Sequence, residues 1–242
     1  MQSIRAILFD MDGLALDTES ISYEAYLRAG KKFGFQVNER LHMDLGGRTE
    51  ECVIAELKRV FGADKNVIEW RKYINKQKDL IASERGYIGK RPGLLELLNY
   101  LNERHIPYAL ASSTNKQKIL ENLSKEYLIH AFPVVVSGDM VHHSKPDPEI
   151  FQISAKRLHV LPKNALVLED ARAGIIAARR GGFQNAFIFD DVSKLGSLDQ
   201  GFPFLVDLPD PRDVEKLAQY KPANLAEVIS IIESTDVKET YA

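Results

Sequence analysis

Ile4-Arg5-Ala6-Ile7-Leu8-Phe9-Asp10-Met11-Asp12-Gly13 is the stretch that decides the fold, because a short apolar run ends there in two acids and a glycine. Such a run is typical of a buried strand, and open parallel sheets place their chemistry at the carboxyl ends of the strands. Once the chain turns at Gly13, one carboxylate can act on a substrate while its neighbour transfers protons. Aspartate and glycine are also ordinary turn residues, so these residues alone do not establish a site.

The composition of the chain is that of an ordinary globular protein. It has 242 residues, and its 45% hydrophobic content is enough for a sizeable core. A net charge of -2 gives no reason to expect nucleic acid or an anionic membrane as the main partner. The single cysteine cannot form an internal disulfide, and neither a signal peptide nor a membrane-length apolar run is evident. We therefore expect a cytoplasmic protein, and we assume a monomer.

Four further apolar runs are expected to form parallel strands beside the first. They are continuous rather than alternating, which is typical of strands buried on both faces. Helical patterns lie between them. The runs cover residues 107–111, 132–136, 165–168 and 186–189, and the helical patterns cover 93–103, a segment from Asp147 onward, and 173–180. This alternation predicts an α/β fold with a Rossmann-like doubly wound parallel sheet.

Residues 16–87 follow a different pattern, with helical spacing and no convincing strand. Apolar residues recur at intervals of three and four over 20–33, 50–61 and 67–83. We therefore expect an α-helical cap domain of residues 16–87 inserted into a core domain of residues 1–15 and 88–242, with hinges near 14–17 and 87–91. In the tail after residue 190 we expect loops and a last helix near 225–232. The prolines that favour loops there are Pro203, Pro209, Pro211 and Pro222.

Polar side chains follow four of the predicted strands. Because the carboxyl ends of parallel strands face the same side of a sheet, these groups can converge on one crevice. Carboxylate oxygens suit Mg²⁺, and lysine and hydroxyl donors can bind phosphate oxygens. The set therefore points to phosphoryl chemistry. Its members are Asp10 and Asp12, then Ser112, Ser113, Thr114 and Asn115, then Lys145, and finally Glu169 and Asp170.

Four sequence motifs follow one another along nearly the whole chain, up to about residue 190. They are Phe9-Asp10-Met11-Asp12-Gly13 through Asp17-Thr18-Glu19, Ala111-Ser112-Ser113-Thr114, Ser144-Lys145-Pro146-Asp147-Pro148-Glu149-Ile150-Phe151, and Leu168-Glu169-Asp170 with Ala173-Gly174. In these motifs the chain resembles the haloacid dehalogenase superfamily, in the branch with a helical cap after the first strand. That branch includes sugar-phosphate phosphatases and β-phosphoglucomutase.

The resemblance implies a Mg²⁺-dependent phosphatase that hydrolyses a small phosphorylated metabolite, such as a sugar or polyol phosphate, through an aspartyl-phosphate. Asp10 would be the nucleophile, and Asp12 would be the general acid and base. Ser112 and Lys145 would bind the transferring phosphate. Mg²⁺ would be held by Asp10, the main-chain carbonyl of Asp12, and Asp170, with Glu169 beside or behind it. Further candidates for binding substrate are Ser113, Asn115, Thr18 and Arg48.

Two departures from the family pattern affect the function. Ala171 stands where the family often has a hydroxyl residue, so one hydroxyl near the metal is lost. Ser22 stands where the mutases of this branch carry a histidine, which weakens the alternative of a β-phosphoglucomutase-like sugar-phosphate mutase. A non-catalytic metabolite-binding member is a third alternative, and the presence of both Asp10 and Asp12 speaks against it.

Several candidates also have a structural interpretation. Ser112 to Asn115 could form a helix-capping turn, Glu169 and Asp170 could cap the next helix, and Arg48 could be a surface arginine rather than a ligand of a second phosphate or of sugar hydroxyls. For four cap residues the structural interpretation is the expected one. Lys76 and Lys78 should belong to a solvated helix face, Trp70 to the cap core, and Cys52 should be a small buried apolar residue.

Overall fold

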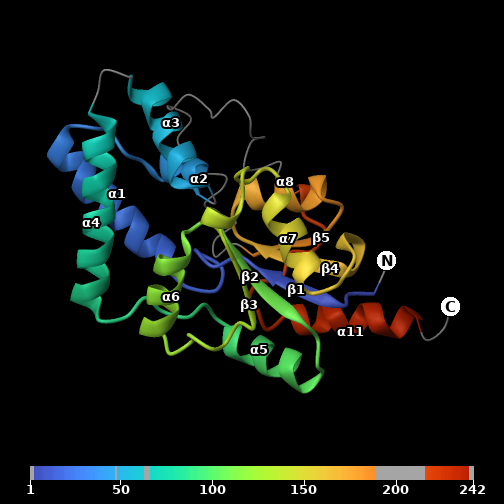
Figure 1. Ribbon diagram of the computed structural model, residues 1–242. Coiled ribbons are helices and arrows are strands. Elements are labelled where there is room, and N and C mark those ends of the chain that lie inside the picture. Colours follow the sequence, from blue (N-terminus) through green and yellow to red (C-terminus); the bar gives the residue numbers. More distant parts are fainter. Residues whose placement is uncertain (1–2, 47, 63–65, 189–215, 240–242) are drawn as a thin grey trace.

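The centre of the molecule is a five-stranded parallel sheet (Figure 1). The structure is a computed structural model that describes residues 3–46, 48–62, 66–188 and 216–239. The strand order is β3-β2-β1-β4-β5, so the chain winds outward from β1 in both directions. The predicted α/β fold with a doubly wound parallel sheet is confirmed. The strands are β1 (Ala6–Phe9), β2 (Tyr108–Ser112), β3 (Val134–Ser137), β4 (Ala165–Glu169) and β5 (Gln184–Phe187).

Both faces of the sheet are covered, which explains the continuous apolar runs. Ile7 and Phe9 of β1 pack in the core cluster that includes α5 (Leu94–Glu103) and α11 (Val228–Glu239). Ala6 and Leu8 point the other way, into a cluster with α7 (Glu149–Arg157) and α8 (Arg172–Arg180). Figure 1 shows these two helix pairs on opposite sides of the sheet, and α6 (Lys116–Lys125) follows β2.

β3 and β5 differ from their predicted bounds for identifiable reasons. β3 begins at Val134 rather than at residue 132, and the intervening Pro133 has no N–H to donate to a sheet. β5 begins at Gln184 because two polar side chains are buried with partners. The Gln184 side chain donates to the Lys163 carbonyl at 3.0 Å, and Asn185 Oδ1 accepts from the Gln219 N–H at 3.1 Å. The predicted strand end at residue 189 lies outside the described residues.

The described residues between 18 and 85 form four helices that lie to one side of the sheet (Figure 1). They are α1 (Thr18–Phe33), α2 (Glu39–Leu45), α3 (Glu50–Phe61) and α4 (Val67–Arg85). Only α2 was not predicted, because seven residues are too few to show a helical period. Trp70 is fully buried among the rings of Phe35 and Phe61, as expected for the cap core. The expectation that Cys52 is buried is wrong, since its side chain is partly exposed.

The chain passes between helices and sheet twice, and the two passages run side by side. The Asp17 N–H donates to the Gly89 carbonyl at 2.9 Å, and the Arg91 N–H donates to the Ala15 carbonyl at 3.0 Å. Leu16 and Lys90 form an antiparallel bridge between them. This paired hinge supports our proposal of a cap of residues 16–87 and a core of residues 1–15 and 88–242.

The last helix, α11, starts three residues later than expected and extends to Glu239. The segment with Pro203, Pro209 and Pro211 lies outside the described residues, whereas Pro222 lies in a loop as predicted. Among the helices in the described ranges, none has the length and hydrophobicity that crossing a bilayer requires.

Candidate active site

The predicted polar residues gather where β1, β2 and β4 end. Asp10 follows β1 directly, and its N–H donates to the Leu168 carbonyl of β4 at 3.0 Å. Ser112 ends β2, and Glu169 ends β4. A cavity of about 600 Å³ lies between this edge of the sheet and the helical cap. The sequence-predicted residues that line it are Asp10, Asp12, Thr18, Arg48, Ser113, Thr114 and Asn115.

Lys145 connects two of the carboxylates in the floor of the site. Its Nζ atom donates to Asp10 Oδ1 at 2.5 Å, to Glu169 Oε1 at 2.6 Å and to the Ala111 carbonyl at 3.3 Å. Only 2% of Lys145 is exposed, so it is not a solvated loop lysine. Burial lowers the pKa of Lys145, but the Asp10 and Glu169 carboxylates outweigh burial and raise it above the ordinary value. The ammonium therefore stays charged.

The site at the strand ends holds more carboxylates than positively charged side chains. Burial raises the pKa of Asp10 well above its ordinary value, Lys145 opposes this, and Glu169 and Asp12 add to it. Burial also raises the pKa of Asp170, and the nearby charges of Asp10 and Glu169 raise it further. One lysine among these acids leaves an excess of negative charge, and a bound cation would reverse these shifts.

Asp10, Glu169 and Asp170 fit a divalent metal ion. One oxygen from each lies within 4.8 Å of the others, and Asp170 Oδ1 is buried without a hydrogen-bond partner. Hard oxygen donors of this kind suit Mg²⁺. Both carboxylate oxygens of Glu169 already accept hydrogen bonds within the protein. Oε1 accepts from Lys145, and Oε2 accepts from the Ala171 N–H at 3.1 Å. Asp10 and Asp170 are therefore the better placed ligands, with Glu169 behind them.

Two glycines let the backbone approach these acids closely. Gly13 has a φ of 86°, and a Cβ there would lie 2.0 Å from Asp170 Oδ2. A Cβ on Gly174 would lie 1.8 Å from Glu169 Oε1. A side chain at either position would displace the carboxylate that it meets. The glycines of the first and last motifs are therefore steric requirements of the acidic site.

Asp12 is held by two hydroxyl groups. Its Oδ2 atom accepts from Ser112 Oγ at 3.1 Å and from Thr114 Oγ1 at 2.8 Å. Ser112 Oγ also accepts from the Thr114 N–H at 3.1 Å. Thr114 was noted in the sequence only as one of the polar residues after β2, and its contact with Asp12 depends on the turn that follows the strand.

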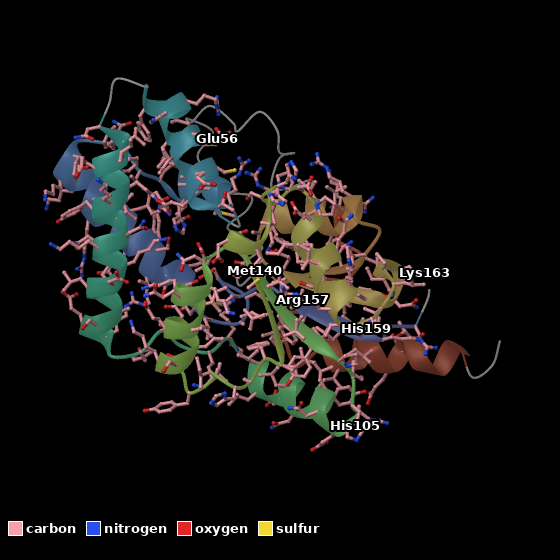
Figure 2. All side chains as sticks on the ribbon, viewed as in Figure 1. Glu56, His105, Met140, Arg157, His159 and Lys163 are labelled. Carbon is pink, nitrogen blue, oxygen red and sulfur yellow. The ribbon has the colours of Figure 1, made fainter. Side chains whose placement is uncertain are left out.

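The remaining predicted substrate residues differ in what they can offer. Asn115 caps α6, and its Oδ1 accepts from the Lys118 N–H at 3.0 Å, so the capping interpretation holds for its oxygen. Thr18 Oγ1 is buried without a hydrogen-bond partner. Arg48 is no surface arginine, because only 7% of its side chain is exposed. Its Nη1 lies 3.6 Å from Glu56, which is labelled on α3 in Figure 2, and its Nε and Nη2 have no partner.

The cap adds to the cavity His42, a residue that the sequence did not single out. Ser22 is buried, and its Oγ lies 2.9 Å from Nε2 of His42, a residue of α2. The same nitrogen lies 3.4 Å from Glu19 Oε2. Burial, with help from the Lys78 and Arg71 charges, lowers the pKa of His42 to about 3. A neutral imidazole thus stands beside Ser22, which occupies the position where the mutases of this branch carry a histidine.

Lys78 corrects an expectation. Its side chain lines the cavity instead of a solvated helix face, whereas Lys76 is exposed as expected. Burial lowers the pKa of Lys78 to about 8, and the charge of Arg71 adds to this effect. Burial raises the pKa of Glu19 to about 7, against the opposing charge of Lys78. Both shifts have burial of the charged group at the cap wall of the cavity as their largest cause.

Comparison with known proteins places this arrangement in a family. The chain is 33% identical over 184 residues to a phosphorylated carbohydrates phosphatase of Thermotoga maritima, covering 76% of this chain and 84% of that one. It is 32% identical over 192 residues to β-phosphoglucomutase of Bacillus subtilis, covering 74% of this chain and 80% of the relative. The crystal structure of β-phosphoglucomutase from Clostridium difficile has the same fold, with a TM-score of 0.75, 21% identity, and coverage of 99% of this chain and 100% of that one.

The family pattern extends over most of the chain. The haloacid dehalogenase-like hydrolase model matches residues 7–188, which run from β1 to the end of β5 and include every predicted site residue. The chain belongs to the haloacid dehalogenase-like hydrolase family.

Proposed function

We propose that the protein is a Mg²⁺-dependent phosphatase that hydrolyses a small phosphorylated carbohydrate or polyol through an aspartyl-phosphate on Asp10. One observation carries this proposal. The Asp10 carboxylate lies at the end of β1, 2.5 Å from the buried Lys145 ammonium, and opens on a cavity of about 600 Å³ that Asp12 also lines. An anionic nucleophile so close to a fixed cation is suited to attack an anionic phosphate.

Two steps account for the hydrolysis. In the first, an Asp10 oxygen bonds to phosphorus, the bond from phosphorus to the ester oxygen breaks, and Asp12 gives its proton to that oxygen. In the second, Asp12 takes a proton from water, the water oxygen bonds to phosphorus, and the bond to Asp10 breaks. The products are the alcohol and inorganic phosphate. Lys145 balances the negative charge on Asp10 and the phosphate throughout.

Asp10, Asp170 and the main-chain carbonyl of Asp12 would hold Mg²⁺, with Glu169 behind them. When bound, Mg²⁺ supplies positive charge between the nucleophile and the phosphate. The Ser112 hydroxyl donates to Asp12 Oδ2 in this structure, and it would have to turn away from Asp12 to donate to a phosphate oxygen.

The size and lining of the cavity support a small polar substrate. Its cap wall offers the unpartnered nitrogens of Arg48, which can bind hydroxyls or a second anionic group. The Thermotoga maritima relative is named for phosphorylated carbohydrates, which supports the same class here.

A sugar-phosphate mutase is the second candidate, because two observations favour it. One relative is named β-phosphoglucomutase, and His42 Nε2 lies 2.9 Å from Ser22 Oγ, so an imidazole is present near that position after all. A mutase must pass its phosphoryl group back to an intermediate, whereas a phosphatase passes it to water. A metabolite-binding protein without catalysis is the third candidate.

A panel of phosphate esters with and without Mg²⁺ separates the three. We expect steady release of inorganic phosphate that needs Mg²⁺ and is abolished by Asp10→Asn. Isomer interconversion after priming with a hexose bisphosphate, with little phosphate release, would identify a mutase. Binding of esters without either reaction would identify a sensor. Mg²⁺-dependent turnover by Asp10→Asn would refute the assignment of the nucleophile.

A further inference from the structure

Glu19 is an acid of the cap helices that lies next to the turn carrying Asp12. It is the second residue of α1, just beyond the hinge, and its Cγ lies 2.7 Å from where a Cβ on Gly13 would be. Gly13 directly follows Asp12. Glu19 and Asp12 also line both the main cavity and a smaller one of about 200 Å³ beside it. The Glu19 carboxylate therefore faces the space that a leaving group must occupy.

The Glu19 carboxylate has acceptor capacity to spare. Its closest partner is His42 Nε2, at 3.4 Å from Oε2, and this histidine is neutral and also shared with Ser22. Although protein surrounds the side chain, 38% of it remains accessible, because it faces the cavity. A carboxylate has about four acceptor positions, and those left without donors in a confined site favour a ligand that brings hydroxyl groups.

The cluster of acids around Glu19 disfavours one kind of ligand. A second phosphate at this point would meet a carboxylate next to Asp12 and Asp170, and like charges in a confined site repel strongly. A neutral hydroxyl would instead donate a hydrogen bond to Glu19 and could accept one from the Lys78 ammonium, which lines the same wall. The wall beside Asp12 is thus suited to the hydroxylated carbons next to the ester oxygen.

His42 fixes the direction of this carboxylate. Only 8% of the residue is exposed, and its ring lies 5.4 Å from the ring of Tyr23 and 5.2 Å from the ring of Tyr26. A ring enclosed in this way cannot turn freely. Its Nε2 atom therefore holds the Ser22 hydroxyl and the Glu19 carboxylate of α1 in fixed positions.

We propose that Glu19, positioned by His42, is a specificity-determining residue that binds a hydroxyl group on the carbon next to the phosphate ester, so that the protein selects esters of vicinal diols. This rests on the proposed phosphatase function. The cap would thus recognise neutral hydroxyls near the reacting bond through Glu19, and any binding of an anion by Arg48 would be a separate interaction.

The test compares two esters that differ only in hydroxyl groups, glycerol 1-phosphate and n-propyl phosphate. The measured quantity is the ratio of kcat/KM for the diol ester to kcat/KM for the plain ester. We expect wild type to favour the diol and Glu19→Gln to lower the ratio about tenfold or more, since a charged hydrogen-bond partner is lost. His42→Ala should lower the ratio too, through KM, and His42→Gln should restore part of it because its amide can still donate. Glu69→Gln, an exposed cap residue, is the matched control and should leave the ratio unchanged.

Two results overturn the inference. One is a wild-type enzyme that hydrolyses p-nitrophenyl phosphate but shows no preference for the diol ester. The other is a Glu19→Gln enzyme that folds, as judged by its unfolding temperature, and keeps the wild-type ratio. Both leave the phosphatase proposal standing. Absence of Mg²⁺-dependent hydrolysis of all three esters would instead count against the proposed function itself.

Discussion

Lys145 Nζ lies 2.5 Å from Asp10 Oδ1, although the two residues are 135 positions apart in the sequence. The same ammonium is 2.6 Å from Glu169 Oε1, and all three residues are almost completely buried. Charges at this depth persist only with partners, because removal of one partner leaves the others uncompensated. The contact therefore ties the ends of β1 and β4 to the loop that carries Lys145.

We expect Lys145→Met to lose stability as well as activity. The substitution leaves the Asp10 and Glu169 carboxylates buried without their cation, which should lower the free energy of unfolding by about 3–5 kcal/mol. Urea unfolding at pH 7 measures this change. Lys156→Met, at an exposed position on α7, is the control and should stay within about 0.5 kcal/mol of wild type. Wild-type stability of Lys145→Met would contradict the buried ion pair.

Mg²⁺ should raise the unfolding temperature of the wild-type protein in the absence of substrate. The reason is that Asp170 Oδ1 is buried without a partner and acids outnumber cations around it. A ligand bound only by the folded state at a hundred times its Kd stabilises it by about 2.7 kcal/mol. Thermal scans of metal-free protein over a Mg²⁺ series measure the shift.

The matched variants for that experiment are Asp170→Asn and Glu103→Gln. Asp170→Asn should lose most of the Mg²⁺-dependent shift, whereas Glu103→Gln removes an exposed acid far from the site and should keep it. An equal shift in wild type and Asp170→Asn would mean that Mg²⁺ acts elsewhere on the protein.

Residues placed by the sheet topology could be predicted from the sequence. Asp10, Ser112 and Glu169 each stand at a strand end, and parallel strands bring their ends together whatever the details of packing. The strands themselves were found because burial on both faces leaves only apolar residues along most of their length. Gln184 and Asn185 were missed because partners far along the chain satisfy their side chains.

Residues placed by packing between cap helices could not be predicted. His42 belongs to a helix of seven residues, and its contact with Ser22 depends on how that helix rests on α1. Lys78 sits on an amphipathic helix where exposed lysines are normal, and only the position of α4 over the core turns its side chain into the cavity. The helical period fixes which residues share a face, but not what that face meets.

Acid should destabilise the wild-type protein more than it destabilises the His42→Gln variant. The pKa of His42 is about 3 in the folded protein and about 6.5 ordinarily, so below pH 6.5 the unfolded chain takes up a proton that the folded protein refuses. The stabilisation from neutral His42 is complete above pH 6.5 and is lost as the pH falls. Between pH 6.5 and pH 5 the loss is about 2 kcal/mol, at 1.36 kcal/mol per pH unit.

Paired urea titrations at pH 7 and pH 5 measure this difference. Glutamine keeps a hydrogen-bonding group of similar reach but does not titrate. From pH 7 to pH 5 the free energy of unfolding should therefore fall by about 2 kcal/mol less in the variant than in wild type. Parallel pH dependence in the two proteins would show that His42 titrates normally and that solvent reaches it.

Glu126 should hold the hinge in place. Its Oε1 accepts from the N–H groups of Ile88 and Gly89 at 2.7 and 2.9 Å, and its Oε2 accepts from Lys90 Nζ at 3.0 Å. Burial raises the pKa of this carboxyl, but the Gly89 and Ile88 donors and Lys90 outweigh it and lower the pKa below the ordinary value. The stabilisation is therefore present above the ordinary pKa of 4.5 and is lost as the pH falls through the lowered value.

Glu126→Gln should lower the free energy of unfolding at pH 7 by about 1–3 kcal/mol, because hydrogen bonds to a charged acceptor are replaced by weaker ones. The deficit should shrink in acid, as the pH falls below 4.5 and then through the lowered pKa of the wild-type carboxyl. Protease cleavage within residues 87–91 should become faster in the variant, since the hinge backbone loses its anchor. Glu103→Gln again serves as the control.

A deficit that stays constant from pH 7 to pH 3, or cleavage no faster than in wild type, would contradict this role of Glu126. It would show that the hinge is held by its own backbone pairing between Leu16 and Lys90 and not by the core carboxylate.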